Sequence, residues 1–198
     1  MLQPRFDLGQ RIRPNAWAVL ARGYLCFLIL LHLFADARAA PAAEDSCAGF
    51  KWDITRERVL FAAAAEAVTA GADIASAPRL MPEQLYELAI APQQKVKFQV
   101  APGKTKFIEG ASGGLVRLHL PTSGEYRISL DQSSWIDVVA ANHLVTAEDF
   151  QGRPDCRAPH KVVLYSLPAG EDLILQLSGA VESHVRVTII PVPAASSR

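Results

Sequence analysis

The pattern that determines this fold is the segment Val116-Arg-Leu-His-Leu-Pro-Thr-Ser-Gly-Glu-Tyr-Arg-Ile-Ser-Leu130, which recurs in outline 47 residues later as Val163-Leu-Tyr-Ser-Leu-Pro-Ala-Gly-Glu-Asp-Leu-Ile-Leu-Gln-Leu177. Apolar residues alternate along the chain on both sides of the Leu-Pro and Gly-Glu pairs. Such alternation is typical of strands with one buried face, joined here by a turn. Each copy therefore predicts a hairpin, and two facing hairpins would form the halves of a sandwich core.

Three further segments alternate in the same way, which gives seven candidate strands with short Gly- and Pro-containing turns. The added segments are Val96–Val100, Trp135–Val139 and Val185–Ile189. Helical periodicity does not interrupt them, so βαβ units are disfavoured. The sequence predicts an all-β fold, an antiparallel β-sandwich of jelly-roll-like type, with a short N-terminal helix and a preceding signal peptide helix.

Residues 44–94 give weaker signals. A short helix is predicted from Asp53, a residue type that caps helices, with Trp52, Ile54, Val59, Leu60 and Phe61 along one side. Residues 62–77 are rich in Ala and Gly and predict an extended or loosely ordered connection. Residues 82–90 fit either a helix begun by Pro82 or a strand, and the β surroundings favour the strand.

The N-terminus is typical of a secretory signal. Arg5, Arg11, Arg13 and Arg22 precede an uncharged run of 11 residues, Tyr24–Phe34, and small residues follow at a predicted cleavage site after Ala39. A retained membrane anchor is the alternative, but a bilayer needs about 20 apolar residues. We expect a signal peptide over 1–39, a segment packed on the sandwich over 40–94, the sandwich over 95–192 and a disordered tail over 193–198. The expected location is the periplasm or outside the cell.

Charge after cleavage excludes two classes of partner. Residues 1–39 contain five of the 20 basic and two of the 20 acidic side chains, which leaves 15 positive and 18 negative groups, a net charge of −3. This balance gives no basic footprint for nucleic acid and no attraction to an anionic membrane surface.

Two cysteines remain after the predicted cleavage, Cys47 and Cys156. In an oxidising compartment such a pair predicts a disulfide, with two separate thiols as the alternative. The bridge would close a loop of about 110 residues, for which chain entropy gives about 4 to 5 kcal/mol. Neither cysteine belongs to a Cys-x-x-Cys motif, so a thioredoxin-like role is disfavoured.

The polar segment 141–161 is the main candidate site, because long loops inside compact domains often carry function. A solvated loop held by Cys156 is the alternative. Trp135 is a further candidate, since an exposed tryptophan on a sandwich suggests carbohydrate, although a tryptophan in such a chain is more often in the core or at the sealed end of the sandwich. The ligand-binding candidates are Trp135, Asn142, His143, Asp149, Arg153, Arg157 and His160.

A metal site is a weaker hypothesis. His143, Glu148 and His160 supply two histidines and one carboxylate, the donor set of non-haem iron oxygenases, but their spacing fits no strand pair. Catalysis by a nucleophile has little support. Gly110-Ala-Ser112-Gly-Gly is typical of a flexible turn and not of a nucleophile elbow, and Gly-rich phosphate loops are absent from the sequence. No catalytic residue is assigned and no cofactor is expected, with iron as the alternative.

Four segments carry a resemblance to known proteins: Cys47-Ala-Gly-Phe-Lys-Trp-Asp-Ile-Thr-Arg-Glu-Arg58, Pro82-Glu-Gln-Leu-Tyr-Glu-Leu88, Tyr126-Arg-Ile-Ser-Leu-Asp131 and Asp149-Phe-Gln-Gly-Arg153. With them the chain resembles small exported proteins of rhizobium-like proteobacteria, some of which carry the name homogentisate 1,2-dioxygenase. Enzymes of that name are iron-dependent double cupins. This chain lacks the cupin His-x-His with its following Glu, so no iron ligand carries over. More loosely, the repeat resembles pre-peptidase C-terminal and carbohydrate-binding β-sandwiches.

These observations favour a non-catalytic binding module that recognises a cell-envelope protein or a glycan. The alternative is an iron-dependent dioxygenase of homogentisate type. A purely structural envelope component is the third class. Fold alone does not separate these functions.

Overall fold

A computed structural model describes residues 45–170 and 173–193. The predicted signal peptide, residues 1–39, and all but the first residue of the predicted tail lie outside the described residues. Across the described ranges, none of the helices has both the length and the apolar character needed to span a bilayer.

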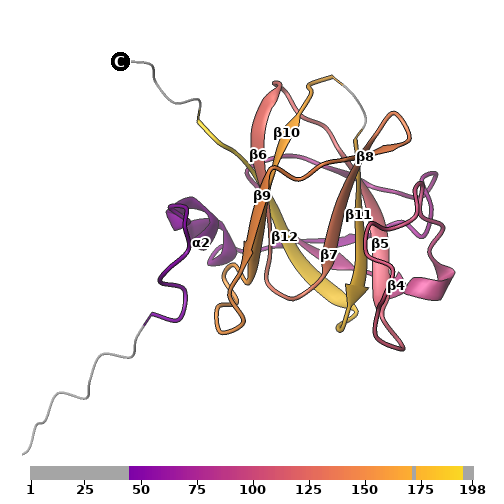
Figure 1. Cartoon of the computed structure of the whole chain (residues 1–198), viewed down its shortest axis with the longest axis horizontal. Coiled ribbons are helices and arrows are strands. Elements are labelled where there is room, and N and C mark those ends of the chain that lie inside the picture. The colour runs from indigo at the N-terminus through magenta and orange to yellow at the C-terminus, as the bar shows by residue number, and fades with distance from the viewer. Residues whose placement is uncertain (1–44, 171–172, 194–198) are drawn as a thin grey trace, which may run out of the picture. The chain divides into compact units, whose positions relative to one another are not determined.

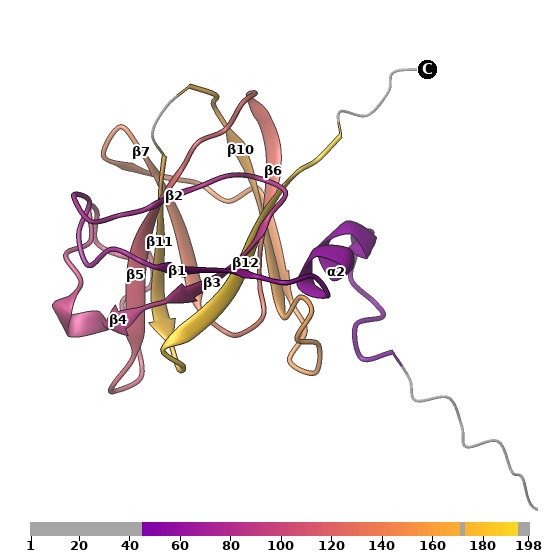
Figure 2. The same ribbon diagram turned by 180° about the vertical axis from the view of Figure 1, so that it is seen from behind.

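Two facing β-sheets form the domain, with one short helix against one of them (Figures 1 and 2). The elements are α2 (Thr55–Phe61), β1 (Glu66–Thr69), β2 (Arg79–Leu80), β3 (Leu85–Ala89), β4 (Ala91–Pro92), the 3-10 turn η1 (Gln93–Lys95), β5 (Ser112–Leu118), β6 (Gly124–Leu130), β7 (Trp135–Ala140), β8 (His143–Val145), β9 (Asp149–Gly152), β10 (Lys161–Leu167), β11 (Leu173–Ala180) and β12 (His184–Pro191).

Sheet A has the strand order β1-β3-β12-β6-β10-β9, and sheet B has the order β2-β5-β11-β7-β8, with β4 also paired to β5. The long strands pair antiparallel, while the short pairs β1–β3 and β2–β5 are parallel. The predicted all-β sandwich is thus confirmed. The strand favoured for residues 82–90 is present as β3.

The repeated segment forms arches between the sheets, and the predicted hairpins are wrong. In each copy the first strand belongs to one sheet and the second strand to the other: β5 and β11 pair in sheet B, β6 and β10 in sheet A. In the first copy the chain crosses through residues 119–123, which include Leu120 and Pro121, instead of making a tight turn within one sheet. The two arches then pair with each other, strand against strand, which satisfies the backbone groups that a hairpin would have paired internally.

The register of these pairs follows the repeat. Leu118 pairs with Leu173, and the equivalent residues 47 positions along, Tyr165 and Tyr126, pair in the other sheet. The next strands occupy equivalent places, but their offset is 51 residues: Val138 of β7 pairs with Leu175, and Ile189 of β12 pairs with Ile128, the residue 47 positions before Leu175. Strands β5-β6-β7 and β10-β11-β12 are therefore two copies of one three-strand unit, related by an approximate two-fold exchange of the sheets.

The core lies between the sheets and contains the residues that the alternation predicted. Their burial supplies the main stabilisation, about 1.5 to 3 kcal/mol for each large apolar side chain. The central cluster includes Val116, Leu118, Leu120, Tyr126, Ile128, Leu130, Ile136, Val138, Val163, Tyr165, Leu167, Leu173, Leu175, Leu177, Val185, Val187 and Ile189.

The strand predicted at residues 96–100 is wrong. This segment follows η1 without strand pairing, and Val96, Phe98 and Val100 pack as half-buried residues on a small cluster on the outer side of sheet B. The fully buried Gln176 of β11 holds it there: its side-chain oxygen accepts from the Val100 amide at 3.2 Å and its NH2 group donates to the Val100 carbonyl at 3.0 Å. The alternation of apolar residues in this segment therefore arises because the segment lies over sheet B and turns every second side chain toward it.

The helix is present, but its buried side differs from the prediction. The helix begins at Thr55, and the residue in the N-cap position is Ile54. Asp53 lies one residue before that position, and its side chain accepts a hydrogen bond from the Thr55 amide at 2.9 Å. Val59 is 66% exposed, whereas Glu57 is fully buried. The reason is the surface below the helix, where Arg127 of β6 lies 2.6 Å from the Glu57 carboxylate. Residues 62–77, predicted as an extended connection, contain the strand β1.

Cys47 and Cys156 form the predicted disulfide, with their Cα atoms 4.8 Å apart. The bridge joins the start of the described chain to the connection between β9 and β10. Two contacts beside it continue the attachment, since the Lys51 amide donates to Gln151 at 2.8 Å and the Lys51 ammonium lies 2.5 Å from Asp149.

Candidate functional site

Segment 141–161 was predicted to be a long loop, and this prediction is wrong. The segment contains β8, the edge strand of sheet B, and β9, the edge strand of sheet A. Residues 146–148 cross from one sheet to the other between these two strands. The chain thereby closes only part of this end of the sandwich, and a cavity remains between the edges.

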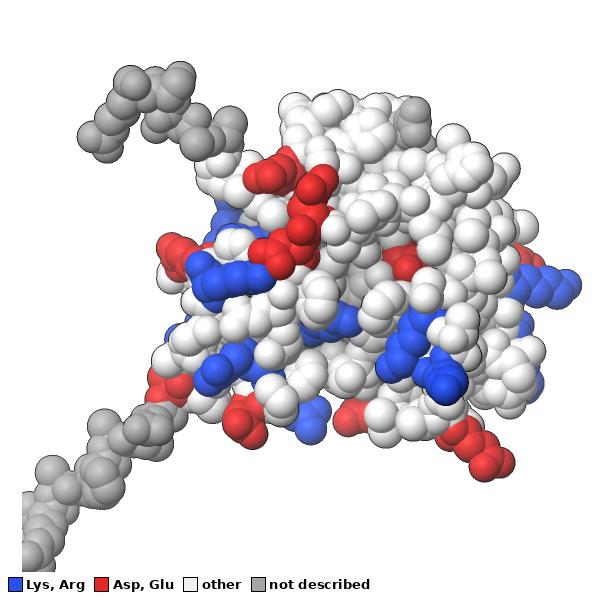
Figure 3. Space-filling model, in the orientation of Figure 1, with Lys and Arg blue, Asp and Glu red and all other residues white. Residues whose placement is uncertain are grey.

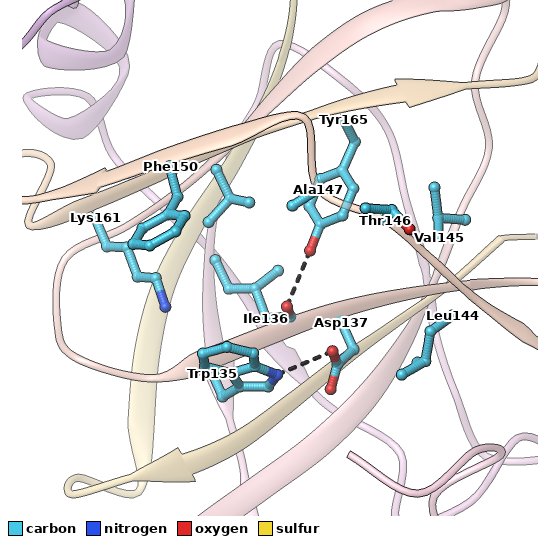
Figure 4. Close-up of a pocket in the computed structure, with 11 residues that line it drawn as sticks. Trp135, Ile136, Asp137, Leu144, Val145, Thr146, Ala147, Phe150, Lys161 and Tyr165 are labelled. Carbon is cyan, nitrogen blue, oxygen red and sulfur yellow. Dashed lines mark hydrogen bonds between the residues drawn. The ribbon is translucent and has the colours of Figure 1, made fainter. Parts of the chain in front are cut away.

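This cavity, which we call the edge cleft, has a volume of about 260 Å³. Figure 4 shows side chains from β7 and β8 on one side and from β9 and β10 on the other. Its walls are mostly apolar, and three rim residues are partly open to solvent: Phe150 is 66% exposed, and Trp135 and Leu144 are each 37% exposed. The lining residues are Trp135, Ile136, Asp137, Leu144, Val145, Thr146, Ala147, Phe150, Lys161, Val163 and Tyr165.

Trp135 is fixed in place by its indole N–H, which donates to Oδ1 of Asp137 at 2.9 Å (Figure 4). The other oxygen of Asp137 accepts from the backbone amide of Gly103 at 3.0 Å. Both oxygens of this buried carboxylate therefore have a hydrogen-bond donor. A charge-assisted bond of this kind orients the indole firmly, so the ring edge presented to the cleft is preorganised.

Lys161 brings a cation to the same place. Its Nζ donates to the Ser134 carbonyl at 2.8 Å and lies 5.1 Å from the centroid of the Trp135 ring. The pKa of Lys161 is lowered to about 8, first by burial and then by the nearby Lys104, while Asp137 opposes the shift. The amine is thus still largely protonated at neutral pH, but its charge is poorly solvated.

Tyr165 forms the back wall. Its hydroxyl donates to the Ile136 carbonyl at 2.9 Å, which ties β10 to β7 across the sandwich (Figure 4). Burial raises the pKa of Tyr165, so the phenol stays neutral and serves as a structural donor. The cleft is therefore held open by a hydrogen bond between the sheets on one side and by the Trp135–Asp137 contact on the other.

Of the ligand-binding candidates predicted from sequence, Trp135 lines the edge cleft and the others lie elsewhere. Asn142 accepts from Gln99 at 2.6 Å, and His143 is exposed on β8. Asp149 pairs with Lys51, as described above. Arg153, Arg157 and His160 lie toward the disulfide end: the Arg153 guanidinium is beside Gly49, Arg157 is 3.7 Å from Glu182, and His160 lines a shallow pocket with Arg157.

The hypothetical metal ligands are not brought together. Across the residues that the structure describes, no three His, Cys, Asp or Glu side chains form a group that could hold a metal ion, and His143, Glu148 and His160 are no exception. His143 belongs to β8, whereas His160 precedes β10. Residues 45–170 and 173–193 therefore offer no set of side chains to which an iron centre could be assigned.

Sequence analysis missed Asp137, Phe150, Lys161 and Tyr165 as residues of a site. Asp137 interrupts an apolar strand, and a buried carboxylate in such a strand is a usable signal, because it needs a partner. Lys161 at the start of β10 gave no comparable signal. Figure 3 shows acidic and basic side chains near one another over the middle and lower part of this view, while its upper part is largely uncharged.

Comparisons with known proteins do not place the chain in a family. No protein-family model matches it, and no curated protein matches it. A solved structure of a β-glucosidase from Kluyveromyces marxianus in complex with glucose is similar over 42% of this chain and 10% of its own length, at 13% identity and a TM-score of 0.28. The chain spans about a tenth of that enzyme, and a likeness this slight supports no conclusion about fold or function.

Proposed function

We propose that this domain is an exported, non-catalytic binding module whose edge cleft holds a ring-sized group of a cell-envelope ligand, carried by a glycan or a partner protein. The observation that supports it is the apolar cavity of about 260 Å³ that opens beside Trp135 and Phe150. Ligand sites are concave, mostly apolar and supplied with a few fixed polar groups. The edge cleft has each of these properties.

Size limits the ligand. Pockets for drug-sized molecules span about 300 to 1,000 Å³, so the edge cleft suits a single ring or a short chain from a larger ligand. Phe150, 66% exposed, gains burial when such a group enters. Exposed aromatic side chains at the mouth of a cavity are the residue type that dominates binding energy at interfaces.

Export rests on the disulfide and on the N-terminal sequence. A bridge between Cys47 and Cys156 persists in an oxidising compartment and is rare in the bacterial cytosol. Together with the signal-like residues 1–39, it supports the periplasm or the cell exterior as the place of function. Fractionation that left the protein in the cytosol with reduced thiols would contradict this part of the proposal.

Binding can be followed through Trp135 itself. The chain has three tryptophans, so W17F and W52F substitutions leave Trp135 as the remaining tryptophan, whose fluorescence is excited separately from that of the four tyrosines. The doubly substituted protein is titrated with benzyl alcohol as a minimal ring probe and is then applied to an array of bacterial envelope glycans and to envelope extract. We expect a saturable change in Trp135 fluorescence and at least one retained envelope component.

The variants F150S and V59S form a matched pair, because Phe150 and Val59 are both 66% exposed. F150S is expected to weaken binding about tenfold, within the range for a partly buried anchor residue. V59S, on α2, should leave it unchanged. A flat titration together with no retained component above background, or equal effects of the two variants, would reject the proposal.

A further inference from the structure

Beside the edge cleft lies a second, polar cavity of about 180 Å³, which shares Trp135 and Lys161 with it. The other side chains that define its chemistry are Lys104, Ser133, Ser134 and Ser178. Two ammonium groups and three hydroxyls thus surround a small volume. The residues lining this cavity include no carboxylate.

The two lysines have no anionic partner in the described part of the chain. Neither Lys104 nor Lys161 forms a salt bridge there. Asp137 is the nearby acid, but its two oxygens already accept hydrogen bonds from Trp135 and Gly103. Lys161 donates to the Ser134 carbonyl, which accounts for one of its three N–H groups. The remaining donors keep their capacity for an oxyanion.

Ser178 supplies an independent observation. It is fully buried on β11, and its hydroxyl has no hydrogen-bond partner among the described residues. Buried hydroxyls are normally satisfied, so an orphan that lines a cavity indicates a missing acceptor or donor there. Leaving such a group unpaired is unfavourable, and an oxyanion accepting its proton would remove the penalty.

We propose that the polar cavity is an anion subsite of the edge cleft, and that the natural ligand is a small amphiphile with a ring-sized apolar body and a carboxylate, sulfate or phosphate head. This inference rests on the proposed binding function. The apolar ring of the ligand occupies the edge cleft, while its anionic group extends past Trp135 to Lys161 and Lys104. The two cations and the Ser178 hydroxyl then acquire the partners that they lack.

The test compares two probes of nearly equal shape. Hydrocinnamate carries a ring and a carboxylate, and hydrocinnamamide replaces the charged head with a neutral amide. Both are titrated against the full chain carrying W17F and W52F, with Trp135 fluorescence as the readout. We expect the acid to bind about tenfold more tightly than the amide, as is typical when a hydrogen bond to a charged group is added.

Three lysine variants locate the effect. K161M and K104M should each reduce the ratio of the affinity for the acid to the affinity for the amide. K104M, which lines the polar cavity but not the edge cleft, should leave the affinity for the amide itself largely unchanged. K97M removes an exposed lysine that lines neither cavity, and it should retain the full preference. A folded K161M protein, checked by circular dichroism, keeps the comparison valid. Equal preference in K97M and K161M would overturn the assignment.

The outcomes also separate this inference from the proposed function. If the amide and the acid bind equally, the anion subsite is wrong while the binding cleft stands. If neither probe binds, the anion subsite is wrong, and the proposed function fails with it when benzyl alcohol also gives a flat titration and no envelope component is retained. Phenylethyl phosphate and phenylethyl sulfate, titrated in the same way, identify the head group among the three oxyanions, and the tightest of the three names the ligand class.

Discussion

Replacing Lys161 with methionine is expected to stabilise the protein at neutral pH, although the substitution removes a hydrogen bond. In the unfolded chain the amine has a pKa near 10.5, and in the folded protein burial lowers that pKa to about 8. The difference corresponds to about 3 kcal/mol of unfavourable free energy for keeping the charge in the folded state at pH 7. Methionine fills a similar volume without that charge.

Two favourable contacts must be subtracted. The hydrogen bond from Lys161 to Ser134 is worth about 1 kcal/mol, and the ammonium 5.1 Å from the Trp135 ring about 0.5 kcal/mol. The net expectation is a gain of about 1 to 2 kcal/mol in the free energy of unfolding. For a domain of this size that raises Tm by about 2 to 8 °C.

The pH dependence gives the sharper check. Between pH 8 and 10.5 the unfolded chain holds the Lys161 proton and the folded chain releases it, so raising the pH stabilises the wild type. The advantage of K161M should therefore shrink across this window in urea denaturation measured at several pH values. Subtracting the variant from the wild type removes the titration of other groups. A K161M protein that is less stable at pH 7, or an advantage that stays constant up to pH 10.5, would refute the reasoning.

Three further stability predictions can be checked by urea denaturation. Reducing the bridge between Cys47 and Cys156, which are 109 residues apart, should lower the free energy of unfolding by up to about 4 to 5 kcal/mol in wild type and leave a doubly serine-substituted protein unaffected by reductant. Glu57→Gln should cost about 3 to 5 kcal/mol, because Arg127 is then buried without its anion, and adding Arg127→Met should recover most of that loss. Leu175→Ala, at a fully buried site, should cost about 2 to 5 kcal/mol, and a value below 1 would mean that the core is not where the structure places it.

Most of the long strands could be predicted from sequence because one face of each strand packs in the central core, which places an apolar residue at every second position. Period-two alternation therefore identified β5, β6, β7, β10, β11 and β12. The same signal failed at Val96 and Phe98, since a segment laid over a sheet also points every second side chain inward. Short edge strands such as β8 and β9 fall below the length at which alternation can be recognised.

The site was harder to foresee than the fold. Trp135 was identified by residue type, but the cleft exists only because β8 and β9 end their sheets at the same edge, a relation set by strand order. Strand order cannot be read from alternation. The hairpin prediction failed because strand order was unknown. The turn residues after Leu120 and Leu167 are compatible both with a hairpin in one sheet and with an arch between the two sheets.

The two copies of the three-strand unit differ where the ligand would enter. The counterpart of Lys161 in the first copy, 47 residues earlier, is Gly114, and a Cβ atom there would lie 2.7 Å from the Cβ of Ala70. On the opposite flank of the sandwich, the residues that follow β1, Ala70 first among them, occupy the space that a side chain at position 114 would need. The two related units are thus closed on one flank and open on the other, so engineering a second pocket would require removing residues 70–71 before a lysine could be accommodated at position 114.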